Sequence, residues 1–239
     1  MAGNLSAMTG DVRQNLQRLD RLANLGLFSA SVAHEIKHGL TAINTFVEVL
    51  LEKGEDREMA EVVHRELKRI DGLATQMLRF AAPKPPTLAP VNVDALLDHA
   101  LRLLEHQMTA RMISLQRDYR AAPHTVRGDE SQLQQAFMNL LLNAVEAMGT
   151  NGVLTVGTEI TGGKHGSRLL RIQIQDTGAG IPPENLRRLF VPFFTTKKNG
   201  TGLGLAISQR IAHEHQGVIH VQSKINKGST FSLSLPVTE

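Results

Sequence analysis

Apolar side chains in the first part of the chain recur at the three-and-four spacing of an amphipathic helix. One stripe consists of Leu22, Leu25, Ser29, Val32, Ile36, Gly39, Ile43, Phe46 and Leu50, and a second of Leu16, Leu19, Ala23, Ala30, Ala33, Leu40, Val47 and Leu51. A polar turn signal at residues 53–56 interrupts the pattern, which then continues from Met59 to Leu78. The pattern predicts two long antiparallel helices.

The apolar faces of these two predicted helices are too wide for one hairpin to cover. We therefore expect two copies of the chain to pair as a dimeric four-helix bundle. Burial of the same faces against the second half of the chain is the alternative.

The pattern changes after a cluster of prolines at positions 83, 85, 86 and 90, which marks a linker because successive prolines cannot continue a helix. Beyond it, periodicity predicts helices at 93–108, 131–148 and 203–215 and strands at 113–119, 153–160, 169–175, 218–223 and 230–235. Helices mixed with a largely antiparallel sheet predict a two-layer α/β sandwich, so the fold class is α+β. The expected domains are a helical hairpin at 1–82, a linker at 83–90 and a second domain at 91–239.

Composition narrows the possible partners and location of the chain. Hydrophobic residues make up 41% and charged residues 21%, enough for a sizeable core. The net charge of +3 is dispersed, with one Tyr and no Trp, which disfavours a nucleic-acid partner. The sequence contains no apolar run of about 18 residues, so it predicts no membrane-spanning segment. With no cysteine and no signal-like start, we expect a cytoplasmic location, in a soluble protein or in the cytoplasmic part of a longer one.

Two amides on the predicted helix 131–148 are the first candidates for chemistry. Asn139 and Asn143 are four residues apart, so they project from one face of an otherwise apolar helix. Amides in such a place need polar partners, and a hydrated Mg²⁺ ion with its phosphates would supply them. An internally bonded pair of asparagines is the alternative.

A second candidate segment follows the predicted strand 169–175. Asp176 leaves the strand end, where a carboxylate can accept a hydrogen bond from the exocyclic amine of adenine. Gly178 and Gly180 come next and allow the backbone to approach a ligand closely.

A third candidate segment runs through Gly200, Gly202, Leu203 and Gly204 into the last predicted helix, where backbone amides favour phosphate. Residues 190–198 precede it and are first aromatic and then basic, ending in Lys197 and Lys198. This order suits a lid whose lysines face phosphate, although a solvated loop would look the same.

Taken in order, these segments resemble the N box, first glycine box, F box and second glycine box of the histidine-kinase ATP-binding domain. That domain has the Bergerat fold, shared with gyrase and MutL ATPases. The resemblance implies that Asn143 holds Mg²⁺, Asp176 binds the adenine amine, and Gly200, Gly202 and Gly204 lie at the phosphates of ATP. Asn139 stands where the ATPase relatives carry a water-activating Glu. An amide is a poor base, which disfavours hydrolysis and leaves ATP for phosphoryl transfer.

Residues 31–40 resemble the H box in the dimerisation and phosphotransfer domain of sensor histidine kinases. The resemblance implies that ATP phosphorylates His34 and that the phosphoryl group then passes to an aspartate of a response regulator. Val32 and Ile36 each lie about 200° around the helix from His34, which places its imidazole on the polar side. An exposed neutral imidazole is a competent nucleophile, and Glu35 can orient it or accept its proton.

Two positions depart from the family pattern. His38 replaces the usual Asn or Thr, so we expect weak phosphatase activity, and Gly39 replaces a Pro that enforces a helix bend. Residues 34–38 also spell the H-E-x-x-H helix of zinc peptidases, which is one alternative function. A scaffold that binds ATP without catalysis is another; the presence of His34, Asn143 and Asp176 argues against it.

Overall fold

The computed structural model describes residues 40, 41, 43, 61–65, 67, 68, 70–72, 75, 85–162, 168–197 and 200–237. The chain divides into two compact units, Met1–Lys84 and Pro85–Glu239. Within the described ranges, no helix combines the length and apolar character needed to cross a membrane.

In the first unit, the described residues lie on both sides of the turn expected at 53–56, and all of them are helical. Leu40, from before the turn, and Leu67, from after it, are buried in one small cluster, against which Val63 packs. This contact is the one that a helical hairpin requires.

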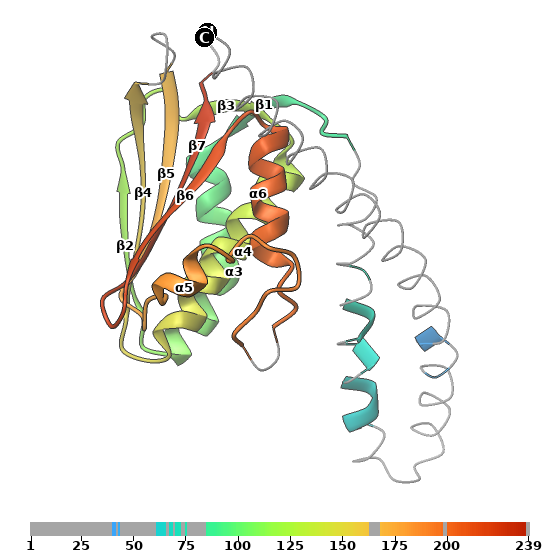
Figure 1. Cartoon of the computed structure of the whole chain (residues 1–239). Coiled ribbons are helices and arrows are strands. Elements are labelled where there is room, and N and C mark those ends of the chain that lie inside the picture. Colours follow the sequence, from blue (N-terminus) through green and yellow to red (C-terminus); the bar gives the residue numbers. More distant parts are fainter. Residues whose placement is uncertain are drawn as a thin grey trace, which may run out of the picture. The chain divides into compact units, whose positions relative to one another are not determined.

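The second unit is built around a five-stranded sheet covered on one face by helices (Figure 1). Its elements are β1 (Ala89–Asn92), α3 (Val93–Ala110), β2 (Ser114–Tyr119), β3 (Thr125–Gly128), α4 (Glu130–Met148), β4 (Val153–Gly162), β5 (Arg168–Asp176), α5 (Pro183–Leu186), α6 (Gly204–Glu214), β6 (Val218–Lys224) and β7 (Gly228–Pro236). The strand order is β2-β4-β5-β7-β6, and β1 pairs with β3 in a separate two-stranded sheet. Helices α3, α4 and α6 form the second layer, which confirms the predicted two-layer sandwich.

Strand alternation explains why only one face of the sheet is covered. On β5, the buried Leu170, Ile172 and Ile174 alternate with the partly or fully exposed Arg171, Gln173 and Gln175. Neighbouring strands repeat this period of two, so their apolar side chains share the face on which the helices pack. Helix α4 contacts both α3 and α6 and also the sheet, and its Phe137, Leu140 and Leu141 are fully buried.

Side chains at the helix ends explain where α3 and α4 begin. The Asn92 Oδ1 accepts the Ala95 N–H at 3.0 Å, and the Asp129 Oδ1 accepts the Gln132 N–H at 3.0 Å, each an N-cap bond. Hydrogen bonds from the Ser131 hydroxyl and the Thr87 N–H to its oxygens keep the pKa of Asp129 low.

A buried histidine joins the end of α6 to the start of α4. His215 is 5% exposed, and its Nδ1 donates to the Ile211 carbonyl at 2.7 Å. Its Nε2 accepts the Asp129 N–H at 2.9 Å, so both ring nitrogens are satisfied in one neutral tautomer. This histidine therefore has a structural role, because it links two elements that are far apart in the sequence.

Most of the elements expected from periodicity are present, with ends shifted by one or two residues. Four features differ from the prediction, the first of which is the unexpected strand β3 at Thr125–Gly128. Strand β1 begins at Ala89, inside the proline-rich stretch, because it pairs with β3. The short helix α5 follows Pro182, and β2 pairs with β4 in parallel within an otherwise antiparallel sheet.

Candidate nucleotide-binding site

The first amide of α4 connects this helix to the start of α6. The Asn139 Nδ2 donates to the Gly204 carbonyl oxygen at 3.0 Å and lies 3.4 Å from the Ser208 hydroxyl. The amide nitrogen of Asn139 is therefore bonded within the protein, which was the alternative to a ligand contact. The contact holds the second glycine box against α4.

The second amide of α4 meets the basic end of the F-box segment, which we define as residues 190–197. The Lys197 Nζ donates to the Asn143 Oδ1 at 2.7 Å. The same ammonium forms an ion pair with the Glu146 carboxylate, three residues farther along the same face of α4. Sequence reasoning predicted roles for Asn143 and Lys197 but missed Glu146, although its spacing from Asn143 was a usable signal.

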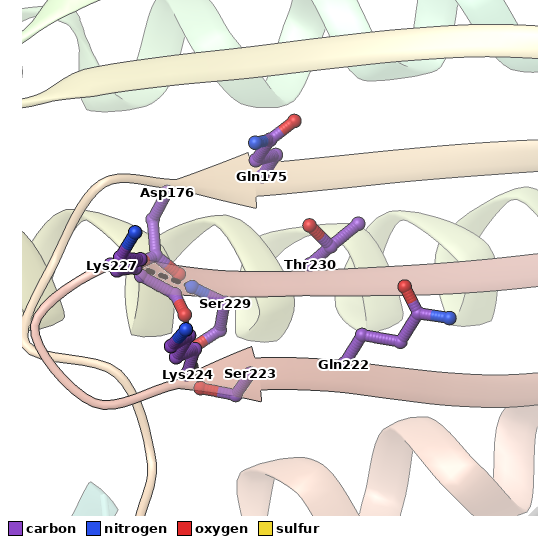
Figure 2. A pocket seen from close by; sticks show the side chains of 9 residues that line it. Gln175, Asp176, Gln222, Ser223, Lys224, Lys227, Ser229 and Thr230 are labelled. Carbon is purple, nitrogen blue, oxygen red and sulfur yellow. Dashed lines mark hydrogen bonds between the residues drawn. The ribbon is translucent and has the colours of Figure 1, made fainter.

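Asp176 ends strand β5 and is 2% exposed. Its Oδ1 accepts the Gly178 N–H at 2.8 Å and the Ser229 N–H at 3.3 Å; Figure 2 shows the second of these bonds. Burial raises the pKa of this carboxyl, and the two backbone N–H groups oppose that rise. Figure 2 also shows Gln175, Thr230 and Gln222 in a row across β5, β7 and β6, lining a polar hollow beside Asp176.

The glycines after Asp176 are required by close contacts within the protein. A Cβ on Gly178 would lie 2.5 Å from the Ala147 carbonyl oxygen, near the end of α4. Gly180 has φ +71°, and a Cβ there would lie 2.2 Å from the Lys224 carbonyl oxygen. The Ala179 N–H donates to the Ala147 carbonyl at 3.1 Å. The first glycine box therefore forms a hydrogen bond with the end of α4 and packs directly against the backbone of β6.

The second glycine box supports the F-box segment. The Phe193 N–H donates to the Gly202 carbonyl at 3.0 Å, and a Cβ on Gly202 would lie 2.4 Å from the backbone of Phe193. The Gly200 N–H donates to the Lys197 carbonyl at 3.1 Å. Leu203 is 1% exposed and is part of the core.

Helix α4 therefore brings together the motifs that the sequence singled out. Asn139 holds the second glycine box, Asn143 and Glu146 hold Lys197, and Ala147 holds the first glycine box. His34 and Glu35 lie outside the described residues, as do His38, Gly39 and Lys198. The zinc-peptidase alternative and the phosphatase prediction depend on residues 34–39 and are not tested by the structure.

Two family models match the chain. The model of the histidine kinase-, DNA gyrase B- and HSP90-like ATPase matches residues 128–239. The model of the His Kinase A (phospho-acceptor) domain matches residues 24–85, which include the H box.

Curated relatives and solved structures agree with both models. The sensor histidine kinase ZraS of Escherichia coli K12 is 34% identical over 230 residues, which cover 95% of this chain and 48% of ZraS. Sporulation kinase A of Bacillus subtilis 168 is 37% identical over 219 residues, covering 91% of this chain and 35% of that kinase. The chain thus spans about half the length, or less, of these relatives.

The catalytic domain of histidine kinase ThkA superposes with a TM-score of 0.56 at 31% identity, covering 62% of this chain and 95% of that domain. A structure of ThkA in complex with the response regulator TrrA matches with a TM-score of 0.66 at 26% identity, over 95% of this chain and 66% of that one. Since both domain models and these relatives point the same way, the chain belongs to the sensor histidine kinase family.

Proposed function

We propose that this chain is an ATP-dependent protein histidine kinase, which phosphorylates His34 and passes the phosphoryl group to an aspartate of a response regulator. The observation that carries the proposal is the convergence of the nucleotide motifs on α4, in a chain whose residues 24–85 match a phospho-acceptor domain. The ThkA complex with a response regulator supports the choice of partner.

The described residues fit a nucleotide with its magnesium ion. Asn143 and Glu146 present an amide and a carboxylate oxygen that already hold the cationic Lys197, and such oxygens are the ligands Mg²⁺ prefers. When bound, Mg²⁺ would neutralise charge on the phosphates. The Asp176 carboxylate accepts a hydrogen bond from the adenine amine. The phosphates are faced by Lys197 and by the backbone at Gly200, Gly202 and Gly204. Gly178, Gly180 and Leu203 shape the walls of the site.

The acceptor histidine supplies the rest of the chemistry. One nitrogen of the neutral His34 imidazole attacks the γ-phosphorus of ATP, the bond between that phosphorus and the β,γ-bridging oxygen breaks, and ADP leaves. Glu35 orients the ring and accepts the proton from its other nitrogen. The adjacent acid thus keeps the attacking nitrogen unprotonated and aligned.

We further propose that the first unit forms a homodimer in the cytoplasm, where ATP and response regulators are present. The phospho-acceptor match supports a dimer. So does the exposure of Ile43, Val62 and Ile70, at 48%, 49% and 36%, because a second copy would cover such apolar side chains in a four-helix bundle.

Labelling with ATP radioactive at the γ-phosphorus tests the main proposal. The full chain should acquire an acid-labile, base-stable label, and His34→Gln should lose it while keeping its affinity for ATP. His38→Gln is the matched control on the same predicted helix and should retain the label. Stoichiometric labelling of His34→Gln on another histidine would refute the assignment.

A further inference from the structure

Glu146 places a negative charge beside a site that we propose for the most highly charged part of ATP. Its carboxylate is 37% exposed and Lys197 is 43% exposed, so water partly surrounds their ion pair. Such surface pairs stabilise folds little. The contribution of the Glu146–Lys197 pair to folding is therefore a poor explanation of why a carboxylate lies there.

The partners of Lys197 suggest a different role. Its ammonium is bound to one amide oxygen and one carboxylate oxygen, both presented by a single helix face. This pair of oxygens suits a hard divalent cation as well as it suits an ammonium. Lys197 and a metal ion cannot occupy the two oxygens at the same time, because each is a cation that needs the same space.

We propose that Glu146 is a positioning residue which, together with Asn143, holds Lys197 in the place that Mg²⁺ takes when ATP binds. Binding of the metal then releases Lys197 from α4 and makes its charge available to the phosphates. This inference rests on the nucleotide site proposed above. It adds a carboxylate oxygen of Glu146 as a second candidate ligand of Mg²⁺ beside Asn143. It also makes Lys197 a competitor of Mg²⁺ for these two oxygens.

If Mg²⁺ displaces Lys197 in this way, substitutions of Lys197 and of Glu146 should change the effect of Mg²⁺ on ATP affinity in opposite directions. Lys197→Met removes the competitor, so Mg²⁺ should strengthen ATP binding by a larger factor than in the unmodified chain. Glu146→Gln removes a negative charge that would attract Mg²⁺ and would repel the phosphates. The factor by which Mg²⁺ strengthens ATP binding should therefore become smaller. We expect changes of about fivefold in each direction, since the groups are partly exposed and screened.

The experiment is calorimetry of ATP binding to the full chain, with excess Mg²⁺ and with a chelator, for both variants. Glu130→Gln is the matched control, because Glu130 is exposed at the other end of α4 and should leave the ratio of the two dissociation constants unchanged. Circular dichroism should show all variants folded, since the substituted side chains are exposed.

Each outcome bears on the proposal. Opposite shifts in the ratio support the exchange. A Lys197→Met variant that weakens ATP binding equally in both media, with Glu146→Gln neutral, would show a plain phosphate contact and overturn it. Equal ratios in all variants would also overturn it while leaving the nucleotide site intact. Absence of ATP binding by the unmodified chain would refute the proposed function and this inference together.

Discussion

Replacing Asp176 by Asn tests the nucleotide site while sparing the fold. The Asp176 Oδ1 accepts N–H groups from Gly178 and Ser229, and an amide oxygen in the same position can accept both. With that oxygen occupied, the new amide nitrogen takes the place of Oδ2. It then points a donor toward the adenine amine, which is itself a donor.

The expected loss of affinity follows from this geometry. A hydrogen bond to a charged acceptor contributes about 1.5–3 kcal/mol, so ATP should bind roughly 10- to 150-fold more weakly. Calorimetry with Mg²⁺-ATP measures the change. Asp118→Asn, on the exposed strand β2, is the control and should leave the affinity unaltered. A folded Asp176→Asn variant that binds ATP as tightly as the unmodified chain would place the adenine elsewhere.

Stability should respond in the opposite direction. Burial raises the pKa of Asp176 above its ordinary value of 3.8, so the folded state retains the proton longer than the unfolded state. The free energy of unfolding of the unmodified chain therefore falls as pH rises from about 3.8 through the raised pKa. Asp176→Asn lacks this loss and should be at least as stable at pH 7, as urea unfolding at several pH values would show. A variant whose relative stability declines toward neutral pH would refute the argument from burial.

Three further predictions concern packing and assembly. His215→Ala should lower the free energy of unfolding by about 3 kcal/mol, because it leaves the Asp129 N–H without its acceptor and removes a buried ring, whereas the exposed His220→Ala should change it by about 0.5 kcal/mol or less in the same urea titration. Gly228→Ala should lower the free energy of unfolding by about 2–4 kcal/mol, because φ there is +91° and a Cβ would lie 1.8 Å from the Asp176 carbonyl oxygen. The same clash should displace Asp176 and weaken ATP binding. An unchanged free energy of unfolding would contradict the contact. Light scattering should find the full chain dimeric and the fragment 85–239 monomeric, and a dimeric fragment would contradict assembly through the first unit.

Local periodicity determined much of this protein from the sequence alone. The spacing of apolar residues located α3, α4 and α6 and five of the strands, because burial on one face imposes a period of 3.6 or 2 whatever the partner is. The same reasoning placed Asn139 and Asn143 on one face of a helix, since four residues make about one turn. A proline-rich stretch predicted a linker at 83–90, and Pro85 is the first residue of the second compact unit.

Contacts between distant residues were decided only by the tertiary structure. Lys197 is 54 residues from Asn143, and His215 is 86 residues from Asp129, so no periodicity records either pair. The pairing of β1 with β3 and the parallel pairing of β2 with β4 likewise depend on how the layers pack. The sequence shows that residues 178 and 180 are glycines. Only the tertiary structure shows that the backbones of α4 and β6 lie where side chains at these two positions would be. The physical reason is that such contacts arise from the register and docking of whole elements, to which each residue contributes only a part.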